Sequence, residues 1–441
     1  MVCTIDVLQG SRAVTPSGAS VSLRAVDGLI AELGADVAPR AGDDVIDARG
    51  DVLLRGLVNG HTHAAMTLFR GYGSDLPLMQ WLEDMIWPAE ARLTDDAVYW
   101  GTRLACIEMI RSGTTRFWDM YWHPVAVARA VCDAGMRAVV GPPVIDGMDA
   151  SRSTAVRAET SDLLDALADF APLVSPSLAP HGIYTASDVT LAWVAEESDR
   201  RNVPVQLHFL ETADEVTGCV ERYGERPGAL LERVGLLSPR LVLAHGVWLG
   251  DAELELIVAS GATVVTNPVS NLKLAVGGIF PYERARAHGV AVGLGTDGAS
   301  SNNSLDLLAD VKVLALVQKH ATSDPAALPA HEAWAIATGA LAPALRGEPV
   351  GGVPATTSDL DVHSSLHVGD RADLFLARHD APELAPGHVI DNLVYAANGS
   401  VVRTTVIAGR VVMREREIQG PDTEDEVRAK VMESARHLGV L

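Results

Sequence analysis

The sequence predicts an α/β fold: a (β/α)₈ TIM barrel with a small β-sandwich domain formed from both chain ends. Two patterns carry this prediction. From about residue 50 onward, short apolar runs alternate with longer segments of helical periodicity, which is typical of repeated βα units. The two flanks instead carry short alternating strands with glycine turns. A chain of 441 residues, 48% of them hydrophobic and 21% charged, has the size and composition for a large packed core.

We interpret eight apolar runs, rich in valine, leucine and alanine, as the parallel strands of the barrel. They are 52–58, 115–120, 138–144, 173–178, 203–209, 241–244, 262–266 and 290–294. Helices are expected between them, several opened by Ser, Thr or Asp and closed near Gly. They are 94–112, 124–134, 161–170, 187–202, 251–260 and 304–320.

The domain organisation follows from these two patterns. We assign 1–55 to the first part of the β-sandwich, 56–365 to the barrel, and 366–441 to the second part of the β-sandwich with a C-terminal helix. In the last segment, 404–408 and 411–414 are expected to form a hairpin around a Gly-Arg turn. The barrel is thus an insertion between two halves of a β structure.

Two further segments of the C-terminal part stand out. Residues 422–437 resemble an amphipathic closing helix with Thr423 or Asp422 as its N-cap. Residues 346–370 are rich in Gly and Pro, and such a long irregular stretch is unusual in a compact domain. We interpret it as a flap or a linker.

Charge excludes several classes of partner. With 35 Lys and Arg against 57 Asp and Glu, the formal charge is −22, which repels nucleic-acid backbones and anionic membranes. No apolar run approaches the ~20 residues that span a bilayer, and the N-terminus has no basic region followed by an apolar one. The four cysteines contain no Cys-x-x-Cys pair, so neither a disulfide framework nor a sulfur-ligated metal site is indicated. A cytoplasmic protein acting on a small molecule is expected.

Polar residues collect just past the apolar runs, where barrel enzymes place their reacting groups. The residues at these positions are His61, His63, His181, His208, Glu211, His245 and Asp297. Side chains alternate along an extended segment, so His61 and His63 point to the same side and can hold one cation. The remaining histidines, His123 among them, lack such placement, and we interpret them as surface or packing residues.

Three imidazoles and one carboxylate suit a borderline ion such as Zn²⁺, with one coordination position left for water. The proposed ligands are His61, His63, His208 and Asp297. Glu211 lies where it can exchange protons with the bound water, and His245 can orient that water. Fe²⁺ or Mn²⁺ can share such ligands. No lysine occurs in the first four barrel units, so a two-metal site bridged by a carbamylated lysine is excluded and one divalent ion per chain is expected.

Several segments together resemble the amidohydrolase superfamily, and within it the methylthioadenosine/S-adenosylhomocysteine (adenosine-type) deaminase family. The resemblance covers nearly the whole chain. The segments are Gly56-Leu-Val-Asn-Gly-His-Thr-His-Ala-Ala-Met-Thr-Leu-Phe-Arg-Gly71, His208-Phe-Leu-Glu211, Ala244-His245, Asn267-Pro-Val-Ser-Asn-Leu-Lys-Leu274 and Gly295-Thr-Asp-Gly-Ala-Ser-Ser-Asn-Asn303.

The resemblance implies hydrolytic deamination of an adenine nucleoside to its inosine analogue with release of ammonia. An activated water would add to C6 of the purine, Glu211 would deliver a proton to N1, and Asp297 would pass a proton toward the departing amine. The family also implies that Glu90, in Trp87-Pro88-Ala89-Glu90, binds the ribose hydroxyls and that His181, in Pro180-His181, contacts the nucleoside. A homodimer or higher homo-oligomer is a further family expectation.

One departure bears on the substrate. Family members that accept S-adenosylhomocysteine have an arginine after the third strand, where this chain has Gly141-Pro142-Pro143. Arg152 is nearby, but its polar surroundings indicate a solvated loop. We therefore expect methylthioadenosine, adenosine and 5′-deoxyadenosine to be preferred over S-adenosylhomocysteine.

Two alternatives remain open. The same barrel and metal could act on another nitrogen heterocycle, such as guanine, a pterin or an s-triazine. Glu90 and the segment 295–303 favour a nucleoside instead. A non-catalytic scaffold is the second alternative, and retention of all four proposed ligands with Glu211 argues against it.

Overall fold

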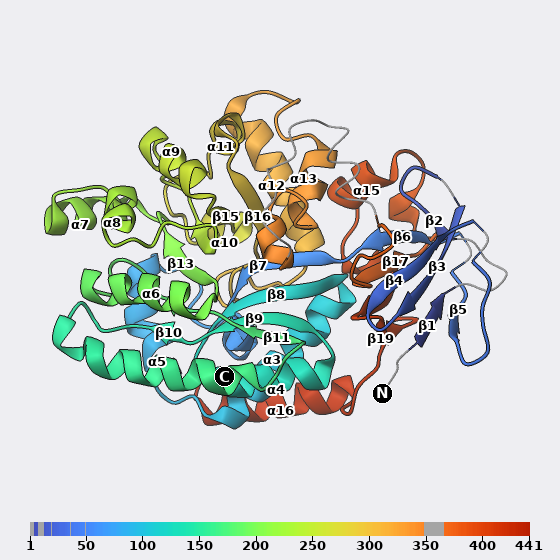
Figure 1. The fold of residues 1–441 in the computed structure, drawn as a ribbon, viewed down its shortest axis with the longest axis horizontal. Helices are drawn as coiled ribbons and strands as arrows, with labels where there is room; N and C mark the ends of the chain where they lie inside the picture. Colours follow the sequence, from blue (N-terminus) through green and yellow to red (C-terminus); the bar gives the residue numbers. More distant parts are fainter. Residues whose placement is uncertain (1–3, 8–12, 19, 36, 49, 348–365) are drawn as a thin grey trace.

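The computed structural model describes residues 4–7, 13–18, 20–35, 37–48, 50–347 and 366–441. Its centre consists of two four-stranded parallel sheets (Figure 1). The first has the order β11-β9-β8-β7 and the second the order β13-β14-β15-β16. Their strands are β7 (Leu57–Thr62), β8 (Thr114–Met120), β9 (Arg137–Gly141), β11 (Val174–Pro176), β13 (Val205–Phe209), β14 (Leu241–His245), β15 (Thr263–Thr266) and β16 (Ala291–Leu294).

Backbone contacts also run between the two parallel sheets. Isolated parallel bridges pair Leu178 with Val205 and Gly182 with His208, next to the short strands β10 (Pro143–Val144) and β12 (Ala179–Pro180). Beyond β16, the Asp297 N–H donates to the His61 carbonyl at 3.0 Å. Parallel strands linked through helices in this way form an α/β fold of the TIM-barrel type.

Helices lie around the outside of these strands (Figure 1). The longer ones are α3 (Asp95–Arg111), α4 (Pro124–Ala134), α5 (Ser153–Ala168), α6 (Asp188–Arg201), α7 (Ala213–Tyr223), α9 (Asp251–Ser260), α12 (Leu307–Thr322) and α16 (Glu424–His437). The shorter ones are α1 (Leu78–Gln80), α2 (Trp87–Glu90), α8 (Pro227–Arg233), α10 (Pro268–Lys273), α11 (Tyr282–His288), α13 (Ala330–Ala337) and α15 (Val389–Tyr395). Short 3₁₀ helices are η1 (Ala64–Phe69), η3 (Ala150–Arg152), η4 (Pro343–Arg346), η5 (Pro382–Leu384) and η6 (Gly399–Val401), whereas η2 (Trp81–Ile86) is a π-helix.

Both chain ends build one further sheet, of the order β20-β19-β18-β17-β6-β2-β3-β1-β5 with β4 paired to β3. Its strands are β1 (Thr4–Val7), β2 (Ala13–Val14), β3 (Ser20–Val26), β4 (Leu29–Gly34), β5 (Asp44–Ile46), β6 (Val52–Arg55), β17 (Leu374–Ala377), β18 (Val402–Ile407), β19 (Arg410–Arg414) and β20 (Glu417–Ile418). A small apolar core that includes Leu23, Leu53 and Leu374 belongs to this sheet. The predicted hairpin is confirmed, because β18 and β19 are antiparallel neighbours.

The structure corrects the first predicted strand. Residues 52–58 do not form one barrel strand: β6 pairs antiparallel with β17 in the chain-end sheet, and only β7 joins the parallel sheet. The chain changes sheet at Gly56, where a Cβ atom would lie 2.1 Å from the Thr115 hydroxyl oxygen. Every residue of both strands is buried, Arg55 before the change included, so burial does not distinguish the two strands.

Other predictions hold or need adjustment. The predicted helix 161–170 begins earlier, at Ser153. The closing helix is confirmed with Thr423 as its N-cap.

Of the segment 346–370, residues 348–365 lie outside the described residues. Cys106, Cys132 and Cys219 are free thiols. No helix in the described part of the chain has the length and apolarity that crossing a bilayer requires.

Candidate active site

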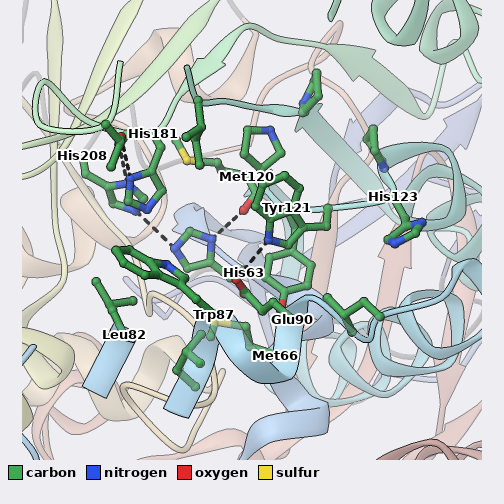
Figure 2. Close-up of a pocket in the computed structure, with 18 of the residues that line it drawn as sticks. His63, Met66, Leu82, Trp87, Glu90, Met120, Tyr121, His123, His181 and His208 are labelled. Atoms are coloured by element: carbon green, nitrogen blue, oxygen red, sulfur yellow. Dashed lines mark hydrogen bonds between the residues drawn. The ribbon is translucent and has the colours of Figure 1, made fainter. Parts of the chain in front are cut away.

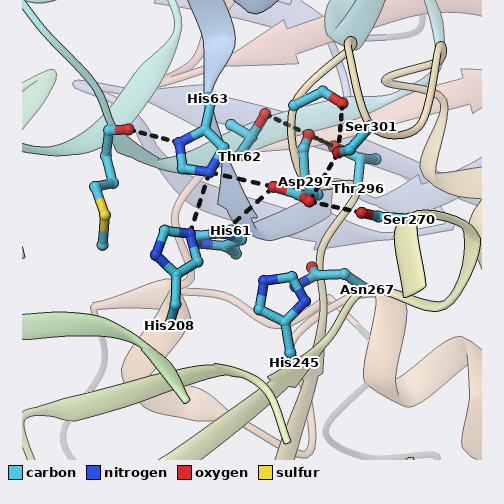
Figure 3. A network of polar contacts seen from close by, with 12 residues as sticks. His61, Thr62, His63, His208, His245, Asn267, Ser270, Thr296, Asp297 and Ser301 are labelled. Carbon is cyan, nitrogen blue, oxygen red and sulfur yellow. Dashed lines mark hydrogen bonds and ion pairs between the residues drawn. The ribbon is translucent and has the colours of Figure 1, made fainter. Parts of the chain in front are cut away.

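The predicted histidines meet at the carboxyl ends of the strands. His61 lies in β7 and His63 directly after it, while His208 lies in β13 and His245 at the end of β14. The ring centroids of His61 lie 4.9 Å from His63, 4.8 Å from His208 and 5.5 Å from His245. Asp297 follows β16 and approaches from the opposite side (Figure 3). Its Oδ1 atom lies 3.5 Å from His61 Nε2 and 3.2 Å from His63 Nε2.

Backbone carbonyls orient two of these rings. His63 Nδ1 lies 2.6 Å from the Met120 carbonyl, and His208 Nδ1 lies 2.6 Å from the His181 carbonyl. A carbonyl only accepts, so each Nδ1 carries the hydrogen and each neutral ring keeps a lone pair on Nε2. The two Nε2 atoms face each other across 3.2 Å. Two lone pairs at this distance repel unless a cation or a proton lies between them.

His61 and Asp297 complete a donor set that fits a divalent cation. His61 Nε2 is buried and has no hydrogen-bond partner among the described residues. The ligand atoms of His61, His63 and Asp297 lie within 4.8 Å of one another, and those of His61, His208 and His245 do so as well. Ser270 and Ser301 donate to Asp297 Oδ2 at 2.6 and 2.8 Å, which leaves Oδ1 facing the histidines. Imidazole nitrogens with one carboxylate oxygen are ligands that Zn²⁺ and similar ions take.

Burial and the close carboxylate set the protonation of these groups. Burial lowers the pKa of His61 to about 4, and it also holds the pKa of His208 well below the usual range. Burial acts on His63 in the same direction, but the hydrogen bond to Asp297, the charges of Asp297 and Asp119 and the Met120 carbonyl together outweigh this and raise the pKa to about 9. Burial opposes ionisation of Asp297, yet the adjacent His61 and His63 keep its pKa well below the ordinary value. A bound cation would therefore displace a proton from His63.

Glu211 and His245 stand beside this cluster. Glu211 follows β13 by two residues, is 6% exposed, and has its Oε1 atom 3.7 Å from His245 Nδ1. Burial raises the pKa of Glu211, which favours a carboxyl that can carry a proton. His245 Nδ1 also lies 2.8 Å from Asn271 Oδ1 in α10. This contact is shorter than the 3.4 Å from Nδ1 to Asn267 Nδ2, so it favours the hydrogen on Nδ1 and leaves Nε2 as an acceptor.

A cavity of about 1030 Å³ opens in front of the cluster. His63, His181, His208, Glu211, His245, Asp297 and Glu90 all line it, while His61 lies behind them at 1% exposure. Figure 2 shows His208 and His181 at one end of the group and Glu90, Tyr121 and His123 at the other. The structure thus brings all eight predicted site residues to one cavity and its wall.

Glu90 has a partner that the sequence did not reveal. Trp122 Nε1 donates to Glu90 Oε2 at 3.0 Å, and burial raises the pKa of Glu90. His181 Nδ1 lies 3.1 Å from the Thr185 hydroxyl. His123, predicted as a surface or packing residue, is 33% exposed and also lines the cavity, with Nδ1 2.6 Å from Asp95 Oδ1. It follows β8 with a left-handed φ of 52°, and no periodic pattern indicates this turn toward the cavity.

The described lining contains no lysine or arginine. Pro142, Pro143 and Gly147 follow β9 and line the cavity. The acidic Glu159 faces the cavity from α5. Arg152 is exposed, and its Nη1 atom lies 3.0 Å from the position that a Cβ on Gly147 would occupy. The exposed side chain does not line the cavity.

Ser270, Asn271 and Ser301 are contacts of the site that sequence reasoning missed as functional residues. Ser270 and Asn271 lie in the segment 267–274 and Ser301 in 295–303, both of which carry the family resemblance. No regular spacing relates them to the histidines, because they reach the site from α10 and from the turn after β16.

Comparison with known proteins decides the family. The model of the amidohydrolase family matches residues 52–412, which is most of the chain. The chain belongs to the amidohydrolase family. Two curated relatives of this amidohydrolase are each 43% identical to it. One, named 5′-deoxyadenosine deaminase, is from Methanoregula boonei and aligns over 415 residues, 93% of this chain and 90% of its own length. The other, named 5-methylthioadenosine/S-adenosylhomocysteine deaminase, is from Syntrophobacter fumaroxidans and aligns over 406 residues, 89% of this chain and 86% of its own.

Solved structures agree with the fold of this amidohydrolase. An adenosine deaminase from Xanthomonas campestris with bound zinc superposes with a TM-score of 0.86 and 32% identity, covering 99% of this chain and 98% of the other. An atrazine chlorohydrolase from Arthrobacter aurescens TC1 complexed with zinc has a TM-score of 0.83 and 21% identity, covering 98% and 100%. At 21% identity the second likeness concerns the fold alone.

Proposed function

We propose that this amidohydrolase catalyses the hydrolytic deamination of an adenine nucleoside to the inosine analogue and ammonia. The observation that carries the proposal is the convergence of four histidines and Asp297 at a cavity that Glu211 and Glu90 also line. Relatives named as deaminases of 5′-deoxyadenosine and of 5-methylthioadenosine/S-adenosylhomocysteine support it. So does the adenosine deaminase of similar structure.

The proposed ligands of one divalent ion, Zn²⁺, are His61, His63, His208 and Asp297. The facing Nε2 atoms of His63 and His208 support this assignment, and so does His61 Nε2, which makes no hydrogen bond to a described residue and lies 3.5 Å from Asp297 Oδ1. When bound, such an ion would supply an activated water at neutral pH. The adenosine deaminase of similar structure is described with bound zinc, which favours Zn²⁺ over Fe²⁺ or Mn²⁺.

The chain's own residues then have separate tasks. Glu211, whose pKa burial raises, delivers a proton to N1 of the purine. His245, with the hydrogen on Nδ1 held by Asn271, presents Nε2 as an acceptor that orients the attacking water. Asp297 accepts the proton of that water and passes it toward the departing amine.

Glu90 is proposed to bind the ribose hydroxyls and His181 to contact the nucleoside, because both line the cavity. The 5′ group then extends toward Pro142, Pro143 and Gly147. An uncharged 5′ group suits this region, since no cation lines it and Glu159 opposes an anion. We therefore propose that methylthioadenosine, adenosine and 5′-deoxyadenosine are preferred over S-adenosylhomocysteine.

We further propose that the two parallel sheets close into one eight-stranded barrel and that the chain-end strands form a β-sandwich. The bridges Leu178–Val205 and Gly182–His208 support closure on one side, and the bond from Asp297 to His61 supports it on the other. The domain division 1–55, 56–365 and 366–441 is consistent with the change of sheet at Gly56.

An ammonia-release assay tests the function. Purified protein loaded with Zn²⁺ is given the four nucleosides in parallel with guanine, a pterin and an s-triazine, and kcat/KM is compared. We expect turnover of the nucleosides, with S-adenosylhomocysteine the poorest of the four. Activity confined to guanine, the pterin or the triazine would contradict the nucleoside assignment. A protein that binds no divalent ion and releases no ammonia would instead be the scaffold considered above.

A further inference from the structure

The backbone leading to Glu211 is held in an unusual conformation. Leu210, between β13 and Glu211, has a φ of +53°, in the left-handed region that non-glycine residues rarely adopt. Its side chain is fully buried. Such a conformation persists only where surrounding contacts impose it. The Leu210 carbonyl accepts from the Trp248 N–H at 3.0 Å, and a contact on the Glu211 N–H would hold the other side of this turn.

Glu215 provides such a contact. Helix α7 begins after the N-cap Thr212, whose hydroxyl accepts a hydrogen bond from the Glu215 N–H. Glu215 is therefore the third residue of the helix, the position from which a capping-box glutamate normally binds the N–H of the N-cap residue itself. Here the Glu215 carboxyl reaches one residue further back, and its Oε2 atom accepts from the Glu211 N–H at 3.1 Å.

The same chain contains the ordinary form of this motif. At α16, Glu426 Oε2 accepts from the N–H of the N-cap Thr423 at 2.8 Å. Both motifs have the sequence Thr-x-x-Glu, but only the first follows a proposed catalytic residue. The contrast indicates that the contact at α7 serves more than capping.

Burial makes the Glu215 carboxyl unfavourable for the stability of the folded protein. Glu215 is 7% exposed, and its Oε1 atom has no hydrogen-bond partner among the described residues. Burial raises its pKa to about 8. Glu426, by comparison, lies in an exposed helix turn. A buried carboxyl with one unpaired oxygen is unfavourable for stability, so capping alone does not account for it.

We propose that Glu215 is a positioning residue, which fixes the backbone at Leu210 and Glu211 and thereby aims the Glu211 carboxyl into the cavity. This inference rests on the proposed function, in which Glu211 transfers a proton to the substrate. A small rotation at Leu210 would move the Glu211 carboxyl away from a ring nitrogen, and proton transfer depends steeply on that alignment.

Three variants separate positioning from capping. Glu215→Gln keeps an acceptor at the same reach, Glu215→Met removes it, and Glu215→Asp keeps a carboxyl that is too short to reach Glu211. The control Glu426→Met removes the ordinary capping contact at α16. The measurements are kcat, KM, bound zinc and the melting temperature of the zinc-loaded protein, with a crystal structure of Glu215→Asp.

We expect kcat to fall at least about tenfold in Glu215→Met and Glu215→Asp, with KM within about twofold and zinc retained. Glu215→Gln should stay within about threefold of wild-type kcat, and Glu426→Met should lower only the melting temperature. In a Glu211→Gln background, Glu215→Asp should cause no further loss, because both changes act through the same group. The crystal structure should show Glu211 displaced from its position 3.7 Å from His245.

An unchanged kcat in Glu215→Asp, or an additive loss in the Glu211→Gln background, would overturn the inference. So would a Glu211 side chain that keeps its position in the crystal structure. Should Glu215→Met fail to fold, Glu215→Asp gives the same comparison, since aspartate is well tolerated in a first helical turn. If the wild-type protein deaminated no nucleoside, the proposed function would fail, while the crystal structure would still test the positioning.

Discussion

At the scale of single residues, the tautomers of three site histidines are set by contacts on the ring nitrogen that faces away from the proposed cation. The carbonyls of Met120 and His181 fix the tautomers of His63 and His208, and Asn271 does the same for His245. A ring whose Nδ1 is held in this way can turn only one nitrogen toward a ligand. The donor set is therefore prepared by the backbone before any cation arrives.

Glu211 and His208 should separate catalysis from metal binding. We expect Glu211→Gln to retain bound zinc and to lose turnover by about 10²- to 10⁴-fold, because glutamine cannot exchange the proton. His208→Ala should lose both zinc and turnover, since a ligand is removed. Metal analysis and ammonia release on the same samples measure both effects. Normal turnover of Glu211→Gln would show that the proton reaches the substrate by another route.

Glu215 should also make stability depend on pH. Burial raises the pKa of its carboxyl from 4.5 to about 8, and the nearby Glu211 carboxylate acts in the same direction. Between these pH values the folded protein holds a proton that the unfolded chain releases. Its contribution to stability is therefore full below about pH 4.5 and is lost as the pH rises through about 8.

Glu215→Gln cannot ionise, so we expect its free energy of unfolding to fall less than that of the wild type between about pH 5 and about pH 8. Glu211, Cys219 and Tyr184 lie around the same position and titrate in both proteins, so the difference between the two curves isolates Glu215. Urea unfolding at several pH values measures it. If the free energies of unfolding of the two proteins changed equally with pH, Glu215 would ionise outside the range from about pH 5 to about pH 8.

At the scale of elements, the two ends of the substrate cavity are built differently. The proposed metal ligands sit in or just after β7, β13 and β16, where hydrogen bonds to neighbouring strands hold them. Glu90 instead ends the short helix α2, just after the π-helix η2. Arg92 connects this segment to the C-terminus, because its guanidinium donates to the carbonyls of Pro88 and Leu438. The proposed ribose contact thus depends on contacts between distant segments.

The bond between Trp122 and Glu90 should therefore affect binding more than chemistry. We expect Trp122→Phe to raise KM for adenosine about three- to tenfold at nearly constant kcat, because a hydrogen bond to a carboxyl contributes on the order of 1 kcal/mol. A matched control is 2′,3′-dideoxyadenosine, which lacks the hydroxyls, and its KM should change little. An equal rise for both nucleosides would show that Trp122 contacts another part of the substrate.

At the scale of the whole molecule, the chain ends brace the first parallel sheet. Helix α16 packs along α3, where Arg103 pairs with Asp422 at 3.0 Å and Arg111 with Glu424 at 2.6 Å (Figure 1). Helix α3 in turn packs on η1, the turn that follows His63. Between the sheets, Arg137 of β9 pairs with Asp373 at 2.9 Å. The C-terminal segment therefore supports the end of β7 that carries the proposed metal ligands.

Removal of metal should lower the stability of the whole protein. An ion that binds only the folded state stabilises it by about 2.7 kcal/mol when its free concentration is 100 times its dissociation constant. We expect chelation to lower the melting temperature and added Zn²⁺ to restore it. In His208→Ala the melting temperature should not respond to Zn²⁺. A wild-type melting temperature that is equal with and without chelator would contradict the proposed centre.

Much of this protein is determined by local patterns in the sequence. Apolar runs alternating with helical segments predict the parallel strands, because a strand buried on both faces must be apolar throughout. The polar residues that interrupt this rule at the strand ends, such as His61, His208 and Asp297, indicate the candidate site, because barrel enzymes place reacting groups at the carboxyl ends of strands. The hairpin and the capped helix at the C-terminus follow from equally local signals.

Tertiary structure decided what depends on distance in space. The division of 52–58 between two sheets at Gly56, the contact of Trp122 with Glu90, and the approach of Asn271 to His245 join residues with no fixed separation along the chain. Glu215 is an intermediate case, because its motif is visible as Thr-x-x-Glu but its reach to Glu211 is not. Periodicity reports which side of an element is buried, whereas these contacts depend on how separate elements pack, which no local pattern encodes.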